Sequence, residues 1–345
     1  MMLPDTDRIR AVLAAACVGD ALGAATEGMS AAEIRSVFGG RVTALTPPPE
    51  KAPFARGLTP GRLTDDATQM LAMAEILIET GGAPEPSDAV RGLLAWAGDE
   101  ETFARFAGPT TRIAVEALKR GAPAASVADP GVYSCVFGTS NGAAMRAPVA
   151  GAVRPGDPEG AAEIAALLAA PTHDTQIAFA GAGAIAAAVA HGLGGGAPAG
   201  MIGAALEGAA AGERIAALRG RVVGGPSLAR RIALAAEIGA RFPGDAETAM
   251  AELEAVIGNG VAMAEAVPTA LGLVVAAGFS PWAALVAAVN GGNDSDTIAM
   301  LAGAVAAAYG ADDLPEEIVR DIERVNALDL RDTAARLAEA ARGRN

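Results

Sequence analysis

Residues 291–297, read as GGNDSDT, place two carboxylates and a threonine hydroxyl directly ahead of a long apolar run. Asp294 and Asp296 are two positions apart, and residues at that spacing do not share a helix face. The two carboxylates can therefore converge only if Asp294 still lies in the loop before the helix. The ordinary alternative is a helix start capped by Asp294 or Ser295. This stretch alone leaves both interpretations open.

A second acidic helix start stands far upstream, at residues 63–68 (LTDDAT), before the apolar run 70–78. One helix cap needs one side-chain oxygen, whereas the two segments together carry four carboxylates. If the two helix starts meet, we expect a cluster of six oxygen-bearing side chains: Thr64, Asp65, Asp66, Asp294, Asp296 and Thr297. Buried charges must be paired or bind a metal, and oxygen donors suit a hard cation, Mg²⁺ before Ca²⁺ or Mn²⁺. The sequence therefore predicts a divalent metal site.

The composition indicates which elements position this cluster. Of the 345 residues 52% are hydrophobic, only 3% are aromatic and 19% are charged, so alanine and the aliphatic residues must build the core. Small side chains let helices approach closely, which favours a helical protein over a β-sandwich. The formal net charge of −14 argues against non-specific binding to nucleic acid or to an anionic membrane.

Cysteine and histidine are too few for other metal or disulfide chemistry. Cys17 and Cys135 form no zinc spacing and no disulfide framework, which fits a reduced cytoplasm. With only His173 and His191 present, a histidine-based metal site is not expected. Charged residues at positions 5–10 argue against a secretory signal. The uncharged segment 271–289 fits two buried helices meeting at residues 278–281 better than a membrane span.

Helical periodicity recurs along nearly the whole chain. A first helix over 7–18 should stop at Gly19, and a glycine- and proline-rich loop should cover 39–62. A helix over 110–120 and an irregular segment over 131–140 follow. Because the acidic segments come from the first third and the last fifth of the chain, one site draws on all of it. We therefore expect a single all-α domain over residues 1–345.

Five motifs occur in an order that resembles the ADP-ribosylglycohydrolase family. They are GDALG at 19–23 with Glu27, LTDD at 63–66, SNGAAMR at 140–146, Thr172-His173, and GNDSDT at 292–297. This family includes the dinitrogenase-reductase-activating glycohydrolase and the ADP-ribosylarginine and ADP-ribosylserine hydrolases. The resemblance spans roughly residues 7–310. Each motif is weak alone, but five in order are specific for the family and much less so for the substrate.

The resemblance implies a compact, orthogonal all-α helical bundle with two Mg²⁺ or Mn²⁺ ions at the bottom of a cleft. The six oxygen-bearing side chains match the metal ligands, and Glu27 matches a mobile glutamate that is the candidate catalytic acid–base. Diphosphate and ribose would be held by Ser140, Asn141, Gly142, Met145, Arg146 and His173. The expected reaction is hydrolysis of the glycosidic bond at ribose C1 of an ADP-ribosylated protein or of a small ADP-ribosyl compound.

Several of these residues have other interpretations. Asp20 lies beside a helix turn and more simply caps backbone amides than binds metal directly. Arg146 is equally well read as the partner of a site carboxylate or as a phosphate contact. Asp174 puts a carboxylate directly after His173, where it could repel a diphosphate or bind a ribose or an amine.

The loop 107–112 carries no carboxylate, although some arginine-directed members have one there. Aromatic side chains that could stack on adenine are few: Phe103, Phe106, Tyr133 and Phe137. A smaller N-riboside is therefore an alternative substrate. A non-catalytic, crystallin-like relative and a metal phosphohydrolase are alternative functions. The oligomeric state is not fixed by the sequence, and a monomer is the simpler expectation.

Overall fold

The computed structural model describes residues 5–123, 127–310 and 312–343. Over these residues the chain forms seventeen α-helices and two 3₁₀ turns, with isolated bridges in place of a β-sheet. The first half contains α1 (Thr6–Gly23), α2 (Ala31–Phe38), α3 (Asp65–Glu79), α4 (Pro86–Trp96), α5 (Glu100–Phe106), α6 (Pro109–Lys119), η2 (Asn141–Ala143), α7 (Ala147–Ala152) and α8 (Pro158–Ala169). The second half contains α9 (Gln176–Leu193), η3 (Pro198–Gly200), α10 (Met201–Arg219), α11 (Leu228–Ala240), α12 (Ala246–Val256), α13 (Met263–Ala276), α14 (Pro281–Gly291), α15 (Ser295–Ala307), α16 (Glu316–Asn326) and α17 (Leu330–Arg342). The all-α prediction is confirmed.

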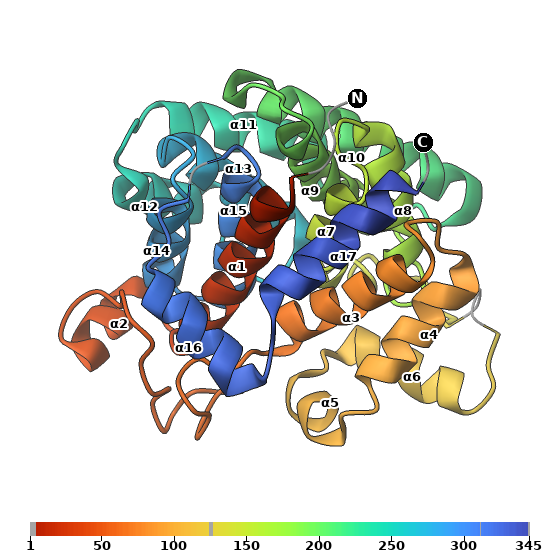
Figure 1. Ribbon diagram of the computed structural model, residues 1–345, viewed down its shortest axis with the longest axis horizontal. Helices are drawn as coiled ribbons and strands as arrows, with labels where there is room; N and C mark the ends of the chain where they lie inside the picture. Colours follow the sequence, from red (N-terminus) through yellow and green to blue (C-terminus); the bar gives the residue numbers. More distant parts are fainter. Residues whose placement is uncertain (1–4, 124–126, 311, 344–345) are drawn as a thin grey trace.

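Helices α1 and α15 form the central pair that carries the site (Figure 1). A Cβ at Gly19 would lie 2.5 Å from the Ala299 carbonyl carbon, and one at Gly23 would lie 2.3 Å from the Asp296 Cα. Only glycine permits this approach. The predicted end of the first helix at Gly19 is wrong, because packing against α15 carries α1 through to Gly23.

Helix α9 forms the other centre of the core, between α8 and α10. Within the described part of the chain it is the one helix long and apolar enough to cross a membrane, yet 89% of it is buried inside the protein. The segment 271–289 is divided between α13 and α14, as predicted. Buried apolar residues from Ile9 to Ala338 join a single core cluster. One domain over 1–345 stays a prediction, which this core supports.

The remaining helices surround these pairs and bring distant segments together. Helix α17 runs beside α1 and α3, so the end of the described chain covers the first helices (Figure 1). Helices α3 to α6 gather at one end of the molecule (Figure 1). The loop 39–62 is free of helix, as predicted, whereas α5 was not predicted from the sequence.

Candidate active site

Acidic side chains from three distant segments meet at one cavity of about 540 Å³. The segments are the start of α3, the start of α15 and the turn that follows α1. The carboxylates that line the cavity are Glu27, Asp65, Asp66, Asp294 and Asp296, and Thr297 lies beside them. The two helix starts predicted to meet therefore do meet.

The start of α3 is capped from within and from α1. Thr64 is the N-cap, and its hydroxyl oxygen accepts the Asp66 backbone N–H at 3.3 Å. Asp20 of α1 accepts the Thr64 hydroxyl at 2.7 Å, the Thr64 backbone N–H at 3.1 Å and the Ala67 backbone N–H at 3.1 Å. Asp20 thus caps backbone amides, as its simpler interpretation held. Thr64 does not line the cavity, so its predicted role as a metal ligand stays a prediction.

The start of α15 uses its acidic residues differently. The helix begins at Ser295, so Asp294 precedes it, and its side chain makes no capping hydrogen bond. Asp294 instead accepts a hydrogen bond from the Asn141 amide, while the Thr297 hydroxyl donates to Asp66 Oδ2 at 2.6 Å. These contacts join both helix starts to the 140–146 segment. The alternative interpretation, in which the Asp294 side chain caps this helix, is therefore wrong.

Glu27 is held beside the α15 carboxylates by the turn after α1. One oxygen each from Glu27, Asp294 and Asp296 lies within 4.8 Å of the others. The Gly28 N–H donates to the Asn293 carbonyl at 2.8 Å, and the Asn293 N–H donates to the Met29 carbonyl at 2.7 Å. The turn is therefore fastened to the start of α15. Gly23, the nearest glycine before Glu27, lies inside α1 and does not loosen this turn.

Burial raises the pKa of each of these carboxyl groups, and repulsion among them raises most of them further. The pKa of Glu27 rises to about 10 and that of Asp65 to about 8, through burial first and then the nearby Asp296. The pKa values of Asp66 and Asp294 are raised well above the ordinary range for the same two reasons. Burial raises the pKa of Asp296 to about 6, against hydrogen bonds from backbone N–H groups.

This cluster suits a divalent cation. Its donors are all oxygens, and among the described residues none of the five carboxylates forms an ion pair with a lysine or arginine. Carboxylates that share a buried space favour a bound positive charge, because it removes both the repulsion and part of the desolvation cost. The residues present therefore fit Mg²⁺ or Mn²⁺.

Another wall of the cavity is built by the 140–146 segment and His173. Ser140, Asn141, Gly142, Met145 and His173 all line the cavity. Burial, with a contribution from Arg146, lowers the pKa of His173 to about 3, so its ring is neutral.

Arg146 does not line this wall. It is 1% exposed and lies behind the wall, where it donates to the Leu168 carbonyl at 3.0 Å and to the Thr172 hydroxyl at 2.8 Å. Among the described residues Arg146 forms no ion pair with a site carboxylate, although its charge lowers the pKa of Asp65, and its contact with a phosphate stays a prediction. Asp174 is turned to Arg221, whose Nη2 lies 2.6 Å from its Oδ1, so its charge is neutralised away from His173.

A third wall of the cavity was anticipated only in part, since the sequence singled out Phe106 and the loop 107–112 but neither Phe54 nor Arg105. Phe54, Arg105, Phe106 and Arg112 line the cavity at the junction of α5 and α6. Arg105 Nε donates to the Phe54 carbonyl at 2.8 Å, which folds the loop 39–62 back onto α5. No local pattern signals a contact across fifty residues of chain.

The other aromatic candidates do not line the cavity. Phe103 packs edge-on against Trp96, and Tyr133 is fully exposed. Phe137 is also absent from the cavity lining.

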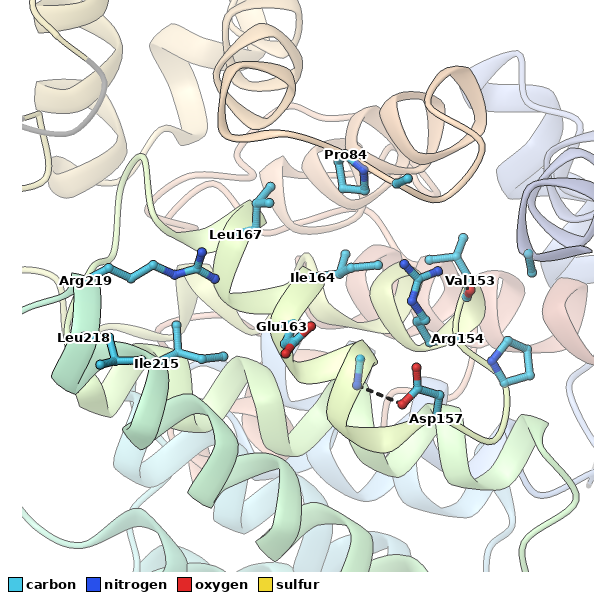
Figure 2. A pocket seen from close by; sticks show the side chains of 14 residues that line it. Pro84, Val153, Arg154, Asp157, Glu163, Ile164, Leu167, Ile215, Leu218 and Arg219 are labelled. Atoms are coloured by element: carbon cyan, nitrogen blue, oxygen red, sulfur yellow. Dashed lines mark hydrogen bonds between the residues drawn. The ribbon is translucent and has the colours of Figure 1, made fainter. Parts of the chain in front are cut away.

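A second, larger cavity of about 930 Å³ lies between α8 and α10 (Figure 2). Its charged side chains alternate in sign, with Arg154 and Arg219 near Asp157 and Glu163, over apolar residues such as Ile164 and Leu167. None of the predicted site residues lines it. Asp157 already caps α8 through the Gly160 N–H, at 3.0 Å. Of these two cavities, the smaller one is where the predicted site residues of the described chain come together.

Comparison with known proteins agrees with the resemblance of the motifs. An uncharacterized Escherichia coli strain K12 protein, YegU, is 30% identical over 97% of both chains. An uncharacterized Archaeoglobus fulgidus protein is 31% identical over 88% of both chains. A solved structure described as an ADP-ribosylglycohydrolase-related protein complex matches the fold with a TM-score of 0.67 and 23% identity, over 99% of both chains. The sequence model of the ADP-ribosylglycohydrolases matches residues 2–345, and the chain therefore belongs to the ADP-ribosylglycohydrolase family.

Proposed function

We propose that this protein hydrolyses the glycosidic bond at ribose C1 of an ADP-ribosylated protein or of a small ADP-ribosyl compound. The observation that carries the proposal is the single cavity in which five carboxylates face the 140–142 segment and the neutral His173. Its volume of about 540 Å³ falls within the usual range for small-molecule sites. Family membership supports a glycohydrolase, and the substrate is inferred from the walls of this cavity.

Different residues of the cavity would bind the metal ions and transfer the proton. Bound Mg²⁺ or Mn²⁺, as a pair of ions, would supply Lewis acidity and an anchor for the ribose hydroxyls. Asp65, Asp66, Asp294, Asp296 and Thr297 would hold these ions. Glu27, with its pKa lowered by the bound positive charge, would take a proton from the attacking water as the water oxygen bonds to C1, and would return a proton to the leaving-group atom as its bond to C1 breaks. The products are ADP-ribose, which carries a hydroxyl at C1, and the protonated leaving group.

The third wall bears on the choice of substrate. Phe54 and Phe106 offer aromatic faces on which a base of the substrate could stack. Arg105 and Arg112 line the same wall, and no carboxylate of the described chain is within ion-pair distance of either. A cationic leaving group would meet like charge there. We therefore expect a neutral or anionic leaving group to be preferred over arginine.

The test is a turnover screen read by mass spectrometry in H₂¹⁸O. The substrates are arginine- and serine-linked ADP-ribosyl peptides, an ADP-ribose ester and simple N-ribosides, each with Mg²⁺ or Mn²⁺. We expect release of ADP-ribose carrying ¹⁸O at C1, fastest from the serine-linked peptide or the ester. The control variant is Asp245→Asn, at an exposed helix cap that does not line the cavity. Label in released phosphate would indicate a phosphohydrolase, and release of free base only from ribosides would favour the smaller substrate.

A further inference from the structure

A buried chain of hydrogen bonds connects Arg146 to the cavity. Arg146, Thr172 and His173 are each at most 1% exposed, and Ser140 at the end of the chain lines the cavity. The three links join Arg146 Nη2 to Thr172 Oγ1, Thr172 Oγ1 to His173 Nδ1, and His173 Nε2 to Ser140 Oγ. Each link measures 2.8 Å. Which atom donates in each of these hydrogen bonds decides whether the Ser140 hydroxyl is a donor or an acceptor toward a ligand.

The direction at Thr172 follows from a count of lone pairs. A guanidinium can only donate, so the Thr172 oxygen accepts from Arg146. Two acceptors are within reach of the Thr172 hydroxyl hydrogen: the Ala169 carbonyl at 3.3 Å and His173 Nδ1 at 2.8 Å. The Ala169 carbonyl already accepts the backbone N–H groups of Thr172 at 3.0 Å and His173 at 2.9 Å, which fills its two lone pairs. The hydroxyl therefore donates to His173 Nδ1.

This direction fixes the tautomer of His173. The ring is neutral, because burial lowers its pKa to about 3. An Nδ1 that accepts leaves the proton on Nε2, which then donates to Ser140 Oγ. Within the described chain the Ser140 hydroxyl makes no other hydrogen bond, so its own hydrogen is left for the cavity. Gly142 makes room for this contact, since a Cβ there would lie 2.9 Å from His173 Cε1.

We propose that Arg146 is a positioning residue which, through Thr172, holds His173 as the Nε2–H tautomer and so makes Ser140 a hydrogen-bond donor to an acceptor oxygen of the substrate. The identity of that oxygen rests on the proposed function, in which it belongs to the diphosphate of the ADP-ribosyl group. A phosphate oxygen only accepts hydrogen bonds, so a Ser140 that is committed as a donor matches it. The opposite tautomer would use the Ser140 hydrogen on the ring and present lone pairs to the phosphate.

The tautomer can be measured directly in the wild-type protein. The chain has only two histidines, so two-bond ¹H–¹⁵N correlation spectra contain two ring systems, which a His191→Gln variant assigns. His191 serves as the internal contrast. The Tyr309 hydroxyl donates to the Ala188 carbonyl at 3.0 Å, so His191 Nδ1, at 2.9 Å from the Tyr309 oxygen, must be the donor. We expect Nε2–H at His173 and Nδ1–H at His191. Nδ1–H at His173 overturns the proposal.

A pair of variants tests the link through Thr172. Thr172→Val keeps the shape and removes the hydroxyl, whereas Thr172→Ser keeps the hydroxyl. With Val we expect the Nδ1–H form of His173 to appear and the affinity for ADP-ribose to fall about tenfold, the usual scale for a hydrogen bond to a charged group. With Ser both properties should return to wild type. An unchanged tautomer in a Thr172→Val protein that retains the wild-type His191 signals overturns the link.

The two proposals fail separately. Wild-type protein that shows the Nε2–H ring but does not bind ADP-ribose with Mg²⁺ supports the tautomer and contradicts the proposed substrate. Protein that binds ADP-ribose with an Nδ1–H ring contradicts the tautomer and supports the substrate. If Thr172→Val does not fold, the wild-type spectrum still decides the tautomer.

Discussion

Helices α3 and α15 begin with similar side chains and use them in opposite ways. At α3 the Thr64 hydroxyl caps the helix, and Asp20 of α1 accepts further N–H groups. At α15 the residue in the capping position, Asp294, makes no capping bond and is turned to Asn141. The start of α3 therefore has a side-chain capping hydrogen bond, and the start of α15 has none.

The difference shows how an acidic helix start becomes a site. Capping at α3 is done by Thr64 and Asp20, so Asp65 and Asp66 remain available to the cavity. At α15 the capping bond, worth about 1 kcal/mol, is lost so that the Asp294 carboxylate can face the other acids. The positive ends of both helix dipoles also point toward the cluster and partly offset its charge. An aspartate in the capping position is thus not proof of a cap.

The largest effect is expected at Asp296, which raises the pKa of Asp20, Glu27, Asp65, Asp66 and Asp294. Asp296→Asn should weaken Mg²⁺ affinity by about 100-fold or more, since even an indirect partner of a metal ligand is worth 10–100-fold. Turnover should be lost with the metal. The metal-free protein should melt at a higher temperature, because repulsion is removed. Titration calorimetry and melting curves in EDTA measure both, beside Asp245→Asn as the control. Unchanged Mg²⁺ affinity would remove Asp296 from the metal site.

Glu27 comes from neither helix start, and its substitution separates catalysis from metal binding. Glu27→Gln should lower turnover by about 10²–10⁴-fold, the usual loss for a general acid–base. ADP-ribose and Mg²⁺ should still bind, as calorimetry would show. A parallel loss of Mg²⁺ affinity would make Glu27 a ligand, and unchanged turnover would contradict any catalytic role.

Asp20→Asn should affect stability in the opposite direction to Asp296→Asn. The Asn amide keeps one acceptor oxygen and places an NH₂ group against donors from Thr64 and Ala67. We expect the free energy of unfolding to fall by about 1–3 kcal/mol with or without metal. Denaturant titration in EDTA and in Mg²⁺ checks this. A metal-free Asp20→Asn protein more stable than wild type would show that repulsion from Asp296 outweighs the cap.

The cluster also predicts a pH dependence that metal reverses. The unfolded carboxyl groups titrate near pH 4, while the folded pKa values of Asp296, Asp65 and Glu27 are about 6, 8 and 10. The folded protein therefore binds more protons than the unfolded chain over this range, and stability falls as pH rises. Metal-free melting temperatures should drop from about pH 5 to about pH 9, and saturating Mg²⁺ should raise them mainly at the alkaline end. A flat metal-free profile contradicts the shared cluster.

The sequence predicted the convergence of the acidic segments because Asp294 and Asp296 stand two apart and four carboxylates exceed what two caps need. It did not predict the part of the third wall made by Phe54 and Arg105, which depends on a loop folding back across fifty residues. The end of α1 was missed because the low helix propensity of Gly19 is overridden by contact with α15. Which of these side chains bind metal and substrate stays a prediction.

Arg146 is a further case that residue type could not settle. An arginine beside a glycine-bearing segment suggests an exposed phosphate contact, since arginine is rarely buried without partners. In the structure its guanidinium donates to the Leu168 carbonyl and the Thr172 hydroxyl inside the protein, while its Nε has no hydrogen-bond partner among the described residues. These partners follow by more than twenty residues, so only the packing of α8 reveals them.

The smallest effect on stability is expected from substitution of Thr64, and its dependence on Mg²⁺ shows whether Thr64 is a helix cap or a metal ligand. The Thr64 hydroxyl donates to Asp20 and accepts the Asp66 N–H, and it does not line the cavity. If it is only a cap, Thr64→Val should lower the free energy of unfolding by about 1–2 kcal/mol equally with and without Mg²⁺. Thr64→Ser, which keeps the hydroxyl, should restore it. Equal losses mean that the Mg²⁺ dissociation constant is unchanged, because metal affinity is the difference between the two stabilities. A loss larger in Mg²⁺ than in EDTA, confirmed by calorimetry, would instead make Thr64 a metal ligand, and the two helix starts would then be more alike than their caps indicate.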